Sequence, residues 1–181
     1  MKNLLRFFVV AALAAGAVRA ADDVVSAVHG TITKLDAATK TMVIKTKDGT
    51  ENTLHFVDKT TVYGADKTAA GAKDSFKGLS EGSEVVVHYT VKGTEKSATE
   101  VDKVGKNGMK YLDGTVTKVG KDGKTVVVKA TDGTEHTFEV AGHAMAETAK
   151  GIGTATDKTG KVTVYYTEDG SKKVAHFFEK I

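Results

Sequence analysis

The chain contains nearly the same stretch of sequence twice. Residues 30–56 read GTITKLDAATKTMVIKTKDGTENTLHF and residues 114–140 read GTVTKVGKDGKTVVVKATDGTEHTFEV, with 13 of the 27 aligned positions identical. The offset between the copies is 84 residues here and 77 residues later on, where VVVHYT at 85–90 matches VTVYYT at 162–167. A repeat of this kind indicates that one structural unit was duplicated. Any fold for the chain must therefore be one that both copies can share.

Alternation of apolar and polar residues predicts β-strands in both copies. Leu54 and Phe56, for example, alternate with polar neighbours, and this period of two buries one face of a strand. Asp48-Gly49 and its counterpart Asp132-Gly133 follow apolar runs, as is typical of hairpin turns. A further pair of strands is expected in each copy from the Val-rich runs at 85 and 162. We therefore expect five short strands in each copy.

The connection between the third and fourth expected strands has a different character. Asp66 is a residue type that caps helices, and a helix from there would pass through Ala69 and Ala70 and end at Gly78, with residues 144–150 as a shorter equivalent. This order of elements predicts an all-β fold of two tandem small five-stranded OB-like barrels, each with a short helix or loop between strands 3 and 4. A single merged sandwich of ten strands is the alternative.

These motifs also resemble a known group of sequences. GTVTKV at 114–119, a Val-rich strand, an Asp-Gly turn and LSEGSEVVV at 79–87 are similar to an uncharacterised family of exported bacterial small β-barrel repeat domains. The resemblance extends over nearly the whole chain after residue 20, although DKTGK at 157–161 departs from the family pattern in the second copy. It implies an OB-like repeat fold and supplies no established activity.

The first 20 residues have the composition of a signal peptide. Lys2 and Arg6 precede the apolar or small residues 7–18, and Val-Arg-Ala at 18–20 has the small residues that signal peptidase recognises. A retained membrane anchor is the alternative, but the apolar run is shorter than the roughly 20 residues of a spanning helix. We predict a signal peptide at 1–20, a first β-barrel repeat at 21–106 and a second at 109–181, with a flexible linker between them. The mature protein would be periplasmic or secreted, without a membrane span.

Removing the signal peptide changes the charge balance. The chain has 26 Lys and Arg against 23 Asp and Glu, and Lys2, Arg6 and Arg19 leave with the signal, so 26 − 3 = 23 cations face 23 anions. The mature chain also lacks Arg and Trp, which grip phosphates and stack on bases. These features exclude nucleic acid as a predicted partner. The absence of Cys excludes disulfides and thiol chemistry.

From the catalytic and cofactor-binding motifs considered, we predict that the protein is not an enzyme and has no cofactor. The sequence contains no His-Glu-x-x-His, phosphate-loop or dinucleotide-binding pattern. Asp48, Asp132 and Asp169 each precede Gly and lack the alternating acids of a calcium loop, so we interpret them as hairpin residues. None of the six histidines matches a histidine in the other copy, and we expect each of them at the solvent-exposed surface.

Two kinds of binding site remain as hypotheses. In the first, an unknown envelope or extracellular partner, a glycan or a peptide, would lie against the rings of four tyrosines, Tyr63, Tyr89, Tyr165 and Tyr166. Tyrosine is also an ordinary strand residue, which is the alternative interpretation. Alternatively, His143 and Met145, with Met109 as a third ligand, offer the soft donors that suit Cu(I). This set is similar to that of periplasmic copper chaperones built on an OB barrel, but those carry their ligands on strands beside a Trp. We predict an exported non-catalytic binding or structural module; the alternative is a periplasmic copper-binding protein.

Overall fold

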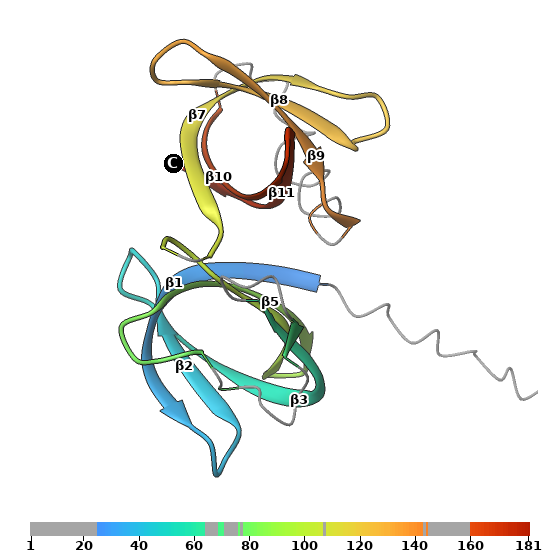
Figure 1. Ribbon diagram of the computed structural model, residues 1–181. Helices are drawn as coiled ribbons and strands as arrows, with labels where there is room; N and C mark the ends of the chain where they lie inside the picture. Colours follow the sequence, from blue (N-terminus) through green and yellow to red (C-terminus); the bar gives the residue numbers. More distant parts are fainter. Residues whose placement is uncertain are drawn as a thin grey trace, which may run out of the picture.

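The computed structural model describes residues 25–63, 69–70, 76, 78–106, 108–142, 144 and 160–181. They form two β-barrels, one after the other along the chain (Figure 1). The first contains β1 (Val25–Asp36), β2 (Thr41–Lys45), β3 (Glu51–Tyr63), β4 (Ala69–Ala70), β5 (Glu84–Lys92) and β6 (Glu95–Lys103). The second contains β7 (Lys110–Val119), β8 (Thr125–Ala130), β9 (Glu135–Val140), β10 (Lys161–Asp169) and β11 (Lys172–Lys180). The prediction of an all-β fold of tandem small barrels is confirmed.

The two barrels share one topology. In the first, the pairings run around a complete ring in the order β1-β2-β3-β6-β5, and in the second the order β7-β8-β9-β11-β10 closes a barrel in the same way. All pairings around each ring are antiparallel except one, because β6 runs parallel to β3 and β11 runs parallel to β9. Among the described residues no named strand of one barrel pairs with a named strand of the other. The alternative of a single ten-stranded sandwich is therefore wrong.

The copies agree even in their irregularities. The first strand of each has a bulge, between Ile32 and Lys34 in β1 and between Val116 and Lys118 in β7. Gly30, just before the bulge in β1, cannot be replaced freely, because an added Cβ would lie 2.6 Å from the carbonyl oxygen of Lys45 on β2. The equivalent Gly114 has the same constraint from the Lys129 carbonyl oxygen, at 2.5 Å. The retained glycines thus mark a close approach of two backbones.

The Asp-Gly turns form as predicted, but they are not the two-residue turns that are typical of the tightest hairpins. Gly49 and Gly133 have φ of 88° and 89°, whereas Lys40 is the only non-glycine residue with positive φ in the part of the chain that the structure describes. A two-residue type I′ turn needs positive φ at both central positions, so these hairpins instead use a longer turn that ends in a glycine. Asp48 Oδ1 accepts the Thr50 amide at 3.0 Å, which fixes the turn.

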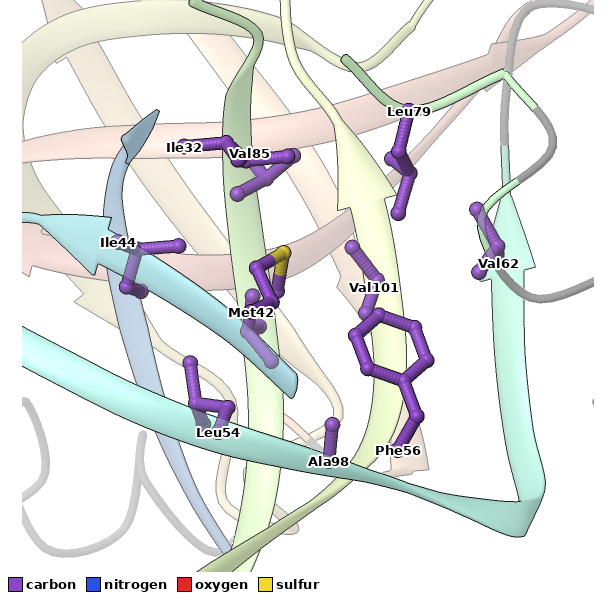
Figure 2. Packing of buried hydrophobic residues seen from close by; sticks show 11 residues of the cluster. Ile32, Met42, Ile44, Leu54, Phe56, Val62, Leu79, Val85, Ala98 and Val101 are labelled. Carbon is purple, nitrogen blue, oxygen red and sulfur yellow. The ribbon is translucent and has the colours of Figure 1, made fainter. Parts of the chain in front are cut away.

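Each barrel has its own core. In the first, inward residues of the strands pack together with Leu79 from the connection, and Figure 2 shows them converging on the barrel axis: Ile32, Met42, Ile44, Leu54, Phe56, Val62, Leu79, Val85, Ala98 and Val101. In the second, the core is built around Phe138, with Val126, Val128, Val140, Val162, Val164, Tyr166 and Ala175. Two separate cores mean that each barrel buries its own apolar face.

The middle connections fit the predicted helix only in part. Ala69 and Ala70, expected inside a helix, form β4, which pairs with Val62 and Tyr63. This expectation is wrong at these two residues because β3 extends to Tyr63 and its backbone groups there accept a strand partner. In the second copy Ala144 donates its amide to the Ala141 carbonyl at 2.9 Å, and residues 145–150 lie outside the described residues.

Candidate functional site

The two barrels are joined through a buried apolar contact. Val86, Val104, Met109 and Tyr165 form a cluster of buried residues, against which Ala27 and Phe177 pack; we call these six residues the inter-barrel cluster. In Figure 1, β1 and β5 lie on the side of the first barrel that faces β10 and β11 of the second. The side chains of the inter-barrel cluster would be exposed on a lone barrel. The contact therefore replaces solvent on one face of each repeat.

Backbone hydrogen bonds join the described residues on either side of the linker between the barrels. The Met109 amide donates to the Lys103 carbonyl at 2.6 Å, and the Gly105 amide donates to the Met109 carbonyl at 2.9 Å. Met109 is 3% exposed. Burial of the Met109 side chain between the barrels favours one orientation of the second barrel relative to the first.

A polar group lies beside the cluster and also crosses between the barrels. The His29 Nε2 atom lies 2.8 Å from Glu84 Oε1, and His29 Nδ1 lies 3.0 Å from the Tyr165 hydroxyl oxygen and 3.2 Å from Glu179 Oε2. Tyr165 donates its hydroxyl hydrogen to Glu179 Oε2 at 2.9 Å. Burial, followed by this hydrogen bond, raises the pKa of Tyr165. The phenol therefore stays protonated and keeps its role as a donor.

A cleft opens where this group meets the turn between β2 and β3. Its volume is about 540 Å³, and both barrels contribute to its lining. The first barrel supplies Ala27, Val28, His29, Thr46, Lys47, Asp48, Thr50 and Asn52, and the second supplies Phe177 and Glu179. We call this the inter-barrel cleft. Its size lies within the range of small-molecule sites, and its lining combines one aromatic ring with hydroxyl, amide and charged groups.

A second polar group is buried on the outer face of β5 and β6. One potential ligand atom each from His88, Glu100 and Asp102 lies within 4.8 Å of the others; we call these residues the buried trio. His88 is 1% exposed and Asp102 is 2% exposed, whereas Glu100 is half-buried. In register, His88 lies opposite Ala27 and Asp102 lies opposite Val86, both members of the inter-barrel cluster. The trio is thus continuous with the face that the barrels share.

The electrostatics of the buried trio are unusual for a surface strand. Burial, then the nearby charge of Glu100 and a hydrogen bond with it, raise the pKa of Asp102 to about 8. Two carboxyl groups in contact do not both ionise readily when one of them is buried, since that one is poorly solvated and the two charges repel each other. The His88 Nε2 atom is 3.8 Å from Asp102 Oδ2, which is too long for a hydrogen bond.

The four candidate tyrosines have different surroundings. Tyr165 belongs to the inter-barrel cluster and Tyr166 to the core of the second barrel, so neither presents an exposed ring. Tyr89 packs against the core of the first barrel, and Tyr63 pairs with Ala69 at the end of β3. They do not form one ligand face. The most exposed tyrosine is Tyr111, 59% exposed, which the sequence analysis did not single out.

Of the three residues in the copper hypothesis, Met109 is the one that the structure describes. His143 and Met145 lie outside the described residues. Met109 is buried in the inter-barrel cluster, where its thioether packs among apolar side chains. This position explains Met109 by packing and gives no support to its role as a third ligand.

One catalytic pattern in the sequence is a chance match. Residues 78–82, GLSEG, fit Gly-x-Ser-x-Gly, but a nucleophile elbow joins a strand to a following helix. Here the segment leads into β5, and the exposed Ser80 hydroxyl pairs with the Ser83 hydroxyl at 3.0 Å. Its role is to form the turn before the strand, since the Gly82 amide donates to the Ile32 carbonyl at 2.8 Å.

Sequence reasoning missed the histidines that the two sites use. The expectation that all six are solvent-exposed is wrong for His29 and His88, because the second barrel covers the side of the first on which β1 and β5 lie. One signal was present in the repeat itself. At the position of His88 the second copy has Tyr165, and at the position of Glu100 it has Phe177, so these positions differ while the fold is kept.

Comparisons with known proteins give limited similarity. No family model matches the chain, and no curated protein sequence matches it. The crystal structure of Ag(I)CusF aligns with 44% of this chain and 96% of that chain, at 10% identity and a TM-score of 0.33. Apo-CusF from Escherichia coli aligns with 48% of this chain and 95% of that chain, at 11% identity and a TM-score of 0.35. At this level the alignments assign no ligand or function to this chain.

Proposed function

We propose that this protein is an exported, non-catalytic binding module of the bacterial envelope or extracellular space, and that the inter-barrel cleft holds its ligand. The observation that supports this proposal is the cleft of about 540 Å³ to which both barrels contribute. The cleft needs both copies, because Phe177 and Glu179 of the second barrel complete the wall begun by β1 and the β2–β3 turn. The duplication then has a functional consequence, since a single repeat would lack the site.

The lining favours a glycan over a peptide as the ligand. Thr46, Thr50 and Asn52 offer hydroxyl and amide groups, and Asp48 and Glu179 offer carboxylates that accept hydrogen bonds from sugar hydroxyls. Phe177 adds one aromatic surface for the apolar face of a sugar ring. The apolar pockets that recognise peptide side chains are not a feature of this lining, where Ala27, Val28 and Phe177 are the apolar members.

The two turns provide matched variants for the test. Lys47 lies in the turn that lines the cleft, and Thr131 is its counterpart in the second barrel, where the turn does not line the cleft. We expect an oligosaccharide panel, followed by amide NMR shifts, to identify a ligand that perturbs residues 46–52 and 177–179. Lys47→Thr and Glu179→Gln should each weaken its binding at least several-fold, and Thr131→Lys should leave it unchanged. Shifts located elsewhere, or a short peptide bound at the cleft in place of sugars, would contradict the proposal.

Export rests on the first 20 residues, which lie outside the described residues. Among the described residues the structure contains no helix long and apolar enough to cross a membrane. Expressed in a bacterium from the full sequence, the protein should be recovered from the periplasm or medium with Ala21 as its first residue. Stable membrane-bound protein that keeps Met1 would show that the segment is a retained anchor.

A further inference from the structure

The buried trio has an arrangement that the fold alone does not require. β5 and β6 place His88 opposite Glu100, and Asp102 follows two residues later on the same outward face. The register shift between His88 and Tyr89 sets this pairing, because Thr99 is the extra residue of the bulge. The second barrel has the same bulge between Tyr165 and Tyr166, but its equivalent positions are Tyr165, Phe177 and Glu179. The shared backbone therefore accepts aromatic residues at two of the three positions where the first copy has ionisable ones.

One oxygen atom of the buried Asp102 side chain is not matched by a hydrogen-bond donor in the described part of the chain. The Asp102 side chain is 3% exposed, and its Oδ2 atom has no hydrogen-bond partner among the described residues. That atom is directed toward His88, at 3.8 Å from Nε2. A buried carboxylate oxygen without a donor is costly. A proton shared with Glu100 relieves the charge of the pair, and a cation between the three groups would relieve it more completely.

We propose that the buried trio is a binding site for a divalent transition-metal cation, with Zn²⁺ as the ion that its donors fit best. One imidazole nitrogen and two carboxylates are ligands that Zn²⁺ accepts, and two carboxylates balance its charge. The ligand atoms of a tetrahedral Zn²⁺ are about 3.3 Å apart at bond lengths near 2.0–2.1 Å. The trio therefore needs side-chain movements of about 1 Å or somewhat more, and the half-buried Glu100 gives the ion a route from solvent. This site is separate from the inter-barrel cleft and does not depend on the proposed function.

The test is a titration of tag-free protein with Zn²⁺ by calorimetry, together with Co²⁺ absorption spectra. Wild-type protein should bind one equivalent, and His88→Gln, Glu100→Gln and Asp102→Asn should each lower the affinity at least about 10-fold. His55→Gln, a change to a histidine on β3 outside the trio, should bind as wild type does. Affinity should increase between pH 6 and pH 8, and binding should release protons, because the ligands must lose theirs.

Folding defects in a variant do not obscure the result. Glu100 is half-buried, so Glu100→Gln removes a ligand at the position of the trio that is least involved in packing. In addition, Zn²⁺ should raise the melting temperature of wild-type protein and leave that of Asp102→Asn unchanged, since a ligand stabilises only the state that binds it. Absence of Zn²⁺ binding by the wild type would overturn the proposal. So would binding that survives all three substitutions, or binding that is lost in His55→Gln.

Discussion

At the scale of single residues, Asp102 should give this protein an unusual dependence of stability on pH. Its pKa is raised by burial and by Glu100 to about 8, from an ordinary value of 3.8. In that interval the folded state holds a proton that the unfolded state has lost, so the free energy of unfolding should fall as pH rises from about 4 to about 8. Urea denaturation of metal-free protein, in the presence of a chelator, measures the effect across this range. Among the described residues, Glu100 and His88 are the titratable groups grouped with Asp102.

Asp102→Asn provides the comparison for this prediction. The amide keeps the shape of the carboxyl group and cannot ionise, so the variant should lose much of the fall in stability between pH 4 and pH 8. Asp36, Asp48, Asp132 and Glu168 have lowered pKa values, and their contributions are lost as pH falls through those values, at and below the acidic edge of this window. If wild type and Asp102→Asn have parallel pH profiles, Asp102 is ionised in the folded protein.

The same residues show why the candidate sites were hard to predict from the sequence. Alternation along the strand correctly places Val85 and Val87 inside the barrel and His88 outside it. A side chain on the outer face of a barrel is exposed to solvent only if that barrel has no neighbour. The contact between the barrels covers that face through Met109 and Tyr165. No short-range sequence pattern predicts this contact. Residue type singles out the tyrosines, whereas packing places Tyr89, Tyr165 and Tyr166 in three different clusters.

At the scale of elements, the Asp-Gly turns can be tested one by one. Gly133 has a φ of 89° and no atom within 4 Å of an added Cβ, so a larger residue there is strained by its backbone and not by its neighbours. Gly133→Val should therefore lower the free energy of unfolding by about 1–3 kcal/mol. Thr131→Val, in the same turn without positive φ, is the control and should change it little. An unchanged melt for Gly133→Val would mean that the turn relaxes at no cost.

Most of the barrel elements follow from short-range patterns. Period-two alternation and Asp-Gly pairs predict the strands, and the repeat doubles the signal, because an accidental pattern would rarely occur in both copies. The middle connections were less predictable. Ala69 and Ala70 have high helix propensity, but the free edge of β3 recruits them as β4, a tertiary effect that outweighs propensity. The parallel closure of β3 on β6 was likewise beyond local patterns, since it joins segments about 40 residues apart.

At the scale of the whole molecule, the inter-barrel cluster should make the two repeats melt together. Met109 contributes a buried thioether to this contact. Met109→Ala should lower the free energy of unfolding by about 2–5 kcal/mol and should separate the melt into two transitions. Val91→Ala, at an exposed position on β5, should shift it by no more than about 0.5 kcal/mol. A single unshifted transition in Met109→Ala would show that the contact carries little free energy.

Separating the repeats tests the same contact without mutation. Residues 21–106 and 109–181, made as two proteins, should each fold, because each ring of strands closes on its own core. Each fragment should give a β-type circular dichroism spectrum and a cooperative melt at a lower temperature than the intact chain, since Val86 and Tyr165 become exposed when the partner is removed. The second fragment should be the less stable one, because its core has 9 buried residues against 11 in the first, counted among the described residues. Fragments that are unstructured alone and ordered only when mixed would show that neither barrel is an independent folding unit.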